Sequence, residues 1–193
     1  MARRTQAQTR VITAATLALS LAACTGEGSD IRYDHSADVP SRGWTTSDTL
    51  FFPITISPTP DTRSPLYVDT DYRLACSIRM DASYAYTSLP LMLILQQTDT
   101  IGSPDGSPYV SRNLLRHALT IPLRDDRGYP VSSSWGSLFQ HEVPIDSLTL
   151  RFDTVGTYRM LVFPATHSNA RLDGITSVGL SLHEVQAMPD GRK

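Results

Sequence analysis

The chain has 193 residues, of which 40% are hydrophobic and 19% charged, and its formal net charge is −2. This length predicts one domain, and the apolar fraction is high enough for a buried core, which excludes a wholly disordered chain. A nucleic-acid-binding protein would show a basic stripe, so the slightly acidic balance argues against nucleic acid as a partner. Two cysteines cannot build a disulfide framework or a four-ligand zinc site, and we expect neither.

The N-terminus has the features of a bacterial lipoprotein signal peptide. Its first ten residues contain three arginines and no acid, and residues 11–23 are uncharged and rich in alanine and leucine. This apolar run is shorter than the ~20 residues that a membrane-spanning helix needs. It ends in Leu21-Ala22-Ala23-Cys24, in which a leucine and two small residues precede the cysteine that receives the lipid. We therefore predict lipidation of Cys24; the alternative is an ordinary secretory signal in which this cysteine is incidental.

These features divide the chain into four parts. Residues 1–23 are predicted to be the signal peptide, and residues 24–40 a flexible tether after the lipidated cysteine. Residues 41–186 are predicted to form the folded domain, and residues 187–193 a disordered tail. Each buried methylene contributes ~0.8 kcal/mol to membrane binding, so several acyl chains on one cysteine hold a domain firmly. The membrane is therefore an expected partner, reached through the lipid anchor.

Apolar and polar residues alternate in two long segments after the tether. Residues 50–56 carry apolar side chains at even positions, and so do residues 70–80. A period of two predicts half-buried strands with one face in the core. Cys76 falls on the apolar face of the second segment, which predicts a buried free thiol rather than a catalytic one. A disulfide between Cys24 and Cys76 remains open only if lipidation does not occur.

The other apolar runs are short and are separated by turn signals. Residues 89–95 are apolar on both faces, which predicts a central strand covered on both sides, with Pro90 near its start. Further strands are predicted at residues 115–123, 139–145, 148–152, 158–163 and 178–185. Turn signals are found at residues 103–108, 125–128, 153–156 and 172–174. About eight short strands predict an all-β chain, a single antiparallel β-sandwich that is jelly-roll-like rather than immunoglobulin-like.

Candidate catalytic chemistry is sparse. His117 and His141 both fall on apolar faces of predicted strands, where they could share a metal, but no third ligand has a fixed spacing. Hydrogen bonding of both rings to the backbone is the simpler interpretation. The chain has no Gly-x-Ser-x-Gly nucleophile motif and no phosphate-binding glycine loop. We therefore predict a non-enzymatic protein with no cofactor and no metal site; a small hydrolase is a remote alternative.

Loops carry recognition on sandwich scaffolds, so candidate contact residues are sought there. Tyr129 and Trp135 are aromatic residues in predicted loops, and His167 and Arg171 belong to a polar loop before the last strand. These four residues are the predicted contact surface. Aromatic side chains can stack on sugars, so a glycan-binding surface lipoprotein is an alternative function. Such rings more often fill a core or cover its ends.

Short motifs follow the lipidation signal in a definite order. They are Tyr33-Asp34, Trp44, Asp48-Thr49-Leu50-x-Phe52, a strand from Tyr72 to Arg79, Trp135-Gly136, Gly156-x-Tyr158 and Leu172-x-Gly174-Ile175-x-x-Val178-Gly179-Leu180. The last motif is the most specific. In this order the motifs resemble the GldH family of gliding-motility lipoproteins of Bacteroidetes, over nearly the whole mature chain.

The resemblance implies an outer-membrane lipoprotein that works with the gliding and type IX secretion machinery. It implies no catalytic residues, and members also occur in bacteria that do not glide. We therefore expect a non-catalytic, lipid-anchored accessory component whose partners are other envelope proteins. Residues 25–29 (Thr-Gly-Glu-Gly-Ser) do not resemble an acidic surface-export tag, which favours the periplasmic leaflet over the cell surface.

Overall fold

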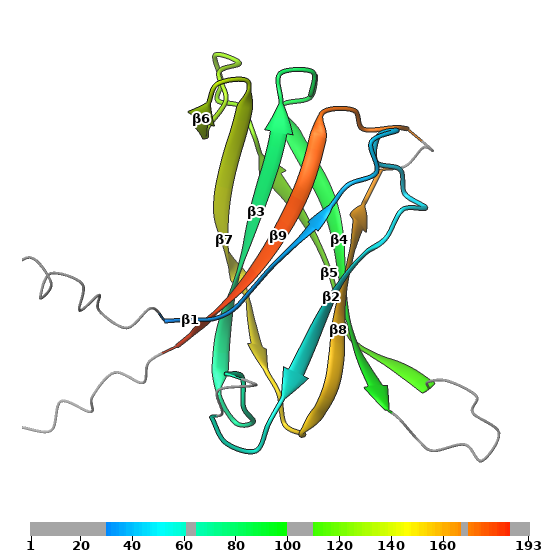
Figure 1. The fold of residues 1–193 in the computed structure, drawn as a ribbon, viewed down its shortest axis with the longest axis vertical. Coiled ribbons are helices and arrows are strands. Elements are labelled where there is room, and N and C mark those ends of the chain that lie inside the picture. Colours follow the sequence, from blue (N-terminus) through cyan, green and yellow to red (C-terminus); the bar gives the residue numbers. More distant parts are fainter. Residues whose placement is uncertain (1–29, 61–64, 100–109, 167–169, 186–193) are drawn as a thin grey trace, which may run out of the picture. The chain divides into compact units, whose positions relative to one another are not determined.

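The computed structural model describes residues 30–60, 65–99, 110–166 and 170–185, and within these ranges the chain forms strands and no helix (Figure 1). The strands are β1 (Ile31–Asp38), β2 (Leu50–Ile56), β3 (Asp71–Asp81), β4 (Ser88–Asp99), β5 (Val110–Pro122), β6 (Ser133–Trp135), β7 (Leu138–Arg151), β8 (Gly156–Pro164) and β9 (Ile175–Glu184). These described ranges accordingly hold no helix long and apolar enough to cross a membrane. The predicted signal peptide with Cys24, the predicted turn at 103–108 and the tail at 187–193 lie outside the described residues.

The strands form two antiparallel sheets. The five-stranded sheet has the order β1-β9-β3-β7-β6, and the four-stranded sheet has the order β2-β8-β4-β5. Eight strands pair from the outside of the chain inwards: β1 with β9, β2 with β8, β3 with β7, and β4 with β5. This nested pairing across two sheets is the jelly-roll arrangement, to which β6 adds one short edge strand. The predictions of an all-β chain and a jelly-roll-like sandwich are confirmed.

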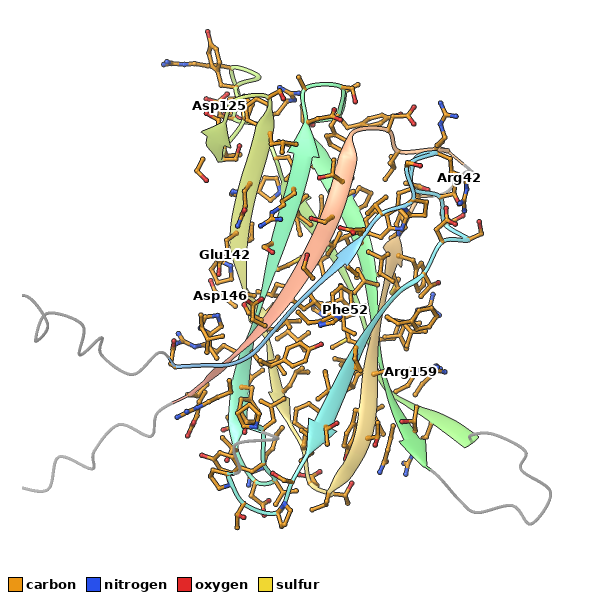
Figure 2. The ribbon with its side chains drawn as sticks, in the orientation of Figure 1. Arg42, Phe52, Asp125, Glu142, Asp146 and Arg159 are labelled. Carbon is orange, nitrogen blue, oxygen red and sulfur yellow. The ribbon has the colours of Figure 1, made fainter. Side chains whose placement is uncertain are left out.

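Alternation of apolar side chains explains why the two sheets face each other. In β2 every second residue is buried, and in β3 the residues at even positions are buried as predicted. Phe52 lies between the sheets, as Figure 2 shows. Phe152 and Tyr158 are in edge contact, with ring centroids 5.0 Å apart. Cys76 is 1% exposed in β3, so the predicted buried thiol is confirmed.

The predicted tether at residues 24–40 is wrong in its second half. Residues 31–38 form β1, an edge strand that pairs with β9, so the folded domain begins at Ile31 rather than at residue 41. Most side chains of β1 are exposed, and the alternation of Ile31, Tyr33 and Ala37 with polar residues is short and weak. Backbone pairing with β9 holds this strand in place, together with partial burial of Tyr33 and Ala37 against the core.

Two predicted strands, 139–145 and 148–152, are one strand in the structure. β7 runs through both segments, and residues 145–148 lie opposite the single residue Leu74 of β3. Ile145 and Leu148 are both buried at a spacing of three, which interrupts the period of two. The break in alternation that predicted a strand end is therefore a bulge within one continuous strand.

The strand predicted at residues 89–95 is central but is not covered on both sides. β4 lies between β8 and β5, and its residues at odd positions from Leu89 to Leu95 are buried against the other sheet. Pro90, Met92 and Ile94, on the opposite face, are only half-buried. No described element of the chain forms a third layer over this face. The prediction is therefore wrong for one of the two faces.

Candidate functional site

Three of the four predicted contact residues lie at one end of the sandwich, here called the loop end (Figure 1). It consists of the connections at residues 39–49, 82–87, 123–132, 165–166 and 170–174 together with β6. Tyr129 is 68% exposed there, and Arg171 is paired with Asp173. Trp135 is in β6, but its side chain lies outside what the structure describes, as does all of His167. None of the described contacts joins Tyr129 to Arg171.

A buried tryptophan organises one half of the loop end. Trp44 is fully buried, and its backbone exchanges two hydrogen bonds with Leu172, at 2.9 and 2.8 Å. Its indole Nε1 donates to the carbonyl oxygen of Asp48 at 2.8 Å. The hydroxyl of Thr45 donates to the Asp48 carboxylate at 2.7 Å, which is the main reason that the pKa of this carboxyl lies below its usual range. Arg42 pairs with the same carboxylate.

A buried tyrosine joins three connections of the loop end. Tyr84 donates its hydroxyl to the carbonyl oxygen of Ser88 at 2.8 Å, and Arg124 donates to the Tyr84 carbonyl oxygen at 2.8 Å. Gly174 has a φ of +89°, and a Cβ there would lie 2.4 Å from the Tyr84 backbone nitrogen. Burial raises the pKa of the Tyr84 hydroxyl, which therefore stays protonated. The loop end is thus a fixed scaffold.

The exposed aromatic side chains described on the loop end lie away from the cavity found there. A cavity of about 480 Å³ opens there beside Asp38, Asp81 and Asp173. Its described lining contains no aromatic residue. Tyr86 and Tyr129 are exposed elsewhere on the loop end. Sugar-binding sites typically stack aromatic rings over a concave surface, and the described lining of this cavity places no ring there.

His117 and His141 do not assemble a metal centre. A ring nitrogen of His117 lies 3.2 Å from the hydroxyl of Ser147, within hydrogen-bonding distance. Burial lowers the pKa of His141, which favours its neutral form. Among the described residues, no three histidine, cysteine or acidic side chains are grouped so that they could hold a metal ion.

A cavity of about 410 Å³ lies beside the bulge of β7 in the five-stranded sheet. Its lining carries both signs of charge, from Arg73, Glu142 and Asp146, together with His183. Figure 2 shows Glu142 and Asp146 on the β7 side of the molecule. The mixture of charges gives this surface no clear preference for an anion or a cation.

An apolar surface on the four-stranded sheet was not predicted from the sequence. Its members are outward-facing side chains of all four strands, and we call them the apolar outer face: Phe51, Met92, Ile94, Ala118, Leu161 and Phe163. Leu161 pairs with Phe51 on one side and with Ile94 on the other, so these side chains form one row across three strands. Phe51 is 53% exposed. The sequence signal that could have indicated this surface is the run at residues 89–95, which is apolar on both faces of the strand.

A polar row crosses the same sheet next to these apolar side chains. The Nε of Arg159 donates to Oε1 of Gln96 at 2.8 Å, and Nε2 of Gln96 donates to Oδ1 of Asn113 at 2.7 Å. The guanidinium carbon of Arg159 lies 5.7 Å from the centre of the Phe51 ring. Arg159 is therefore held in one orientation on the outer side of β8, as Figure 2 shows.

Comparison with solved structures gives weak similarities. The structure of tomato aspermy virus matches 96% of this chain and 98% of the viral chain, with 11% identity and a TM-score of 0.32. The VP2 subviral particle of infectious bursal disease virus matches 79% of this chain and 30% of its own, with 10% identity and a TM-score of 0.24. The stem and receptor-binding domain of spike protein P1 from bacteriophage PM2 matches 82% and 68%, with 12% identity and a TM-score of 0.25. These scores support no conclusion about function.

Comparison with protein families gives a match over most of the chain. No curated protein matches the chain. The sequence pattern of the GldH lipoprotein family matches residues 31–182, which extend from the start of β1 into β9. The match includes the motif from Leu172 to Leu180, which the sequence analysis identified as the most specific. The chain belongs to the GldH lipoprotein family.

Proposed function

We propose that this protein acts by binding, as a lipid-anchored accessory component of the gliding-motility and type IX secretion machinery of the cell envelope. Family membership supports the link to gliding motility. The signal that ends at Cys24 supports the anchor, and the proposed site of anchoring is the periplasmic leaflet of the outer membrane. The cell surface is the alternative location.

The apolar outer face is the observation that favours a binding function over a catalytic one. One face of an antiparallel sheet that is not packed on a core is usually polar, whereas this one presents Phe51, Ile94 and Leu161 in a row. Apolar patches of this kind mark surfaces that contact other macromolecules. A flat apolar patch favours a protein partner, because glycan sites gather aromatic rings over a groove.

Weak contacts suffice for a tethered protein. An anchor confines the domain near one membrane, which raises its effective concentration towards neighbours on that membrane. A patch of less than ~1,200 Å² is then enough for a functional interaction. Tyr129, Trp135 and Arg171 of the loop end, with His167, remain part of the proposed contact surface.

Crosslinking of the lipidated chain in native membranes tests this proposal. We expect envelope proteins, with secretion or motility components among them, to be enriched over a lipidated unrelated domain. No enrichment over that control would contradict the proposal. Tight, specific binding on a glycan array that is lost in the Trp135→Ala variant would instead support the glycan-binding function.

A further inference from the structure

The charged side chains described on the outer side of the four-stranded sheet have one sign. Arg116 and Arg159 point outwards, and β2, β5 and β8 contain no acidic residue. The only acid in β4 is Asp99 at its end, whose side chain is not among those described. The five-stranded sheet differs, since one of its strands, β7, carries two acidic residues, Glu142 and Asp146. The apolar outer face is therefore flanked by positive charge in a chain whose net charge is −2.

Arg159 is oriented to receive an anion. Its Nε is used by Gln96, and its guanidinium lies against the Phe51 ring. Its two terminal nitrogens have no acceptor among the described residues. A guanidinium fixed in this way offers parallel N–H groups, which match the two oxygens of a carboxylate.

We infer that the apolar outer face is the docking surface for a protein partner that presents an apolar patch flanked by carboxylates, one of which pairs with Arg159. The inference rests on the proposed function, since this partner belongs to the envelope machinery. A second copy of the chain packed face to face is disfavoured, because it would bring the arginines of both copies together. A lipid surface is also disfavoured, because Met92, Ile94 and Leu161 are half-buried and offer little of their side chains for insertion among acyl chains.

The test uses a photo-crosslinking amino acid in the full lipidated chain, in its native membrane. The crosslinker replaces Phe51 or Ile94 on the apolar outer face, Tyr129 on the loop end, or Glu142 on the five-stranded sheet. We expect a protein adduct from the first two positions. The adduct should map to a partner surface with aspartate or glutamate, and Arg159→Glu should reduce its yield about ten-fold or more.

Arg79→Glu is the matched control. Arg79 is also an exposed-face arginine whose Nε donates to a glutamine, at 3.1 Å from Oε1 of Gln140, but it lies on the other sheet. This variant should leave the adduct unchanged. Arg159→Gln replaces Arg159→Glu if circular dichroism shows that the latter is unfolded. Reversal of the mapped partner carboxylate to arginine should restore the adduct with Arg159→Glu.

The remaining outcomes separate the inference from the proposed function. Envelope adducts from Tyr129 or Glu142, but not from Phe51 or Ile94, would overturn the docking surface and leave the proposed function standing. Adducts from Phe51 to phospholipid or to a second copy of the chain would overturn the inferred partner. Equal adduct yields for Arg159→Glu and Arg79→Glu would overturn the role of Arg159. The absence of envelope adducts from all four positions would overturn both proposals.

Discussion

Replacing Ile78 by alanine tests the packing between the two sheets. Ile78 is in β3, which is hydrogen-bonded on both sides, with His141 of β7 and Val178 of β9 opposite it. Its side chain is 0% exposed. Truncation of a buried isoleucine to alanine costs ~2–5 kcal/mol, depending on how far the surroundings collapse into the cavity. Because β3 is held from both sides, little collapse is available, and we expect a loss of ~3–4 kcal/mol.

Urea unfolding followed by circular dichroism measures this loss. With a slope of ~2 kcal/mol per molar urea, the midpoint of Ile78→Ala should fall by ~1.5–2 M. Arg79→Ala is the control, because the next side chain points outwards and donates to Gln140 at the surface. Its cost should stay below ~1 kcal/mol. Equal shifts for the two variants, or a larger shift for Arg79→Ala, would refute the assigned facing of β3.

Three further predictions concern the anchor, the thiol and one carboxylate. Radiolabelled palmitate should mark the wild-type chain and not Cys24→Ala, and equal labelling would contradict lipidation at this residue. Burial raises the pKa of the Cys76 thiol to about 12, so a thiol reagent should modify it only after unfolding; rapid modification of the folded chain would contradict this. Tyr67 donates to Glu184 at 2.6 Å and, as the largest cause, holds the pKa of this carboxyl below its ordinary 4.5. The carboxylate therefore stabilises the fold above that pH and loses the effect as the pH falls through its folded pKa. Tyr67→Phe should accordingly lower the melting temperature at neutral pH, and lower it less in acid where this carboxyl is protonated in the folded chain. A loss that is the same at both pH values would argue against this linkage.

The sequence predicts the strands that bury one face and misses those that do not. Residues 50–56 and 70–80 alternate because one side of each strand packs against the other sheet. β1 shows only a short and weak alternation, because it is an edge strand whose side chains are mostly exposed. Its position depends on pairing with β9, more than 130 residues further along the chain, as in Asp38 with Ser177. Single-strand periodicity carries no information about such a partner.

Only part of the candidate site could be predicted, because it too depends on contacts between segments that are far apart in sequence. The jelly-roll order brings Tyr129 and Arg171, which are far apart in sequence, to one end of the sandwich. The apolar outer face was missed because residues 89–95 indicate burial on both sides of a strand. Periodicity reports how much of a strand is suited to burial. It does not report whether the cover belongs to the same chain.

The position of β1 also decides how the domain responds to mechanical load. In an anchored protein, any pull between the membrane and a docked partner reaches the sandwich at Ile31, the first residue of β1. A pull along this strand shears all of its hydrogen bonds to β9 together, whereas a pull across it opens them one after another. Side-chain contacts of Glu184 lie near this end of β1: Glu184 pairs with Arg32 at 2.7 Å and also accepts a hydrogen bond from Tyr67. This carboxylate ties the loaded strand to β9 and to the connection between β2 and β3, so its side-chain contacts add to the backbone hydrogen bonds that resist the pull.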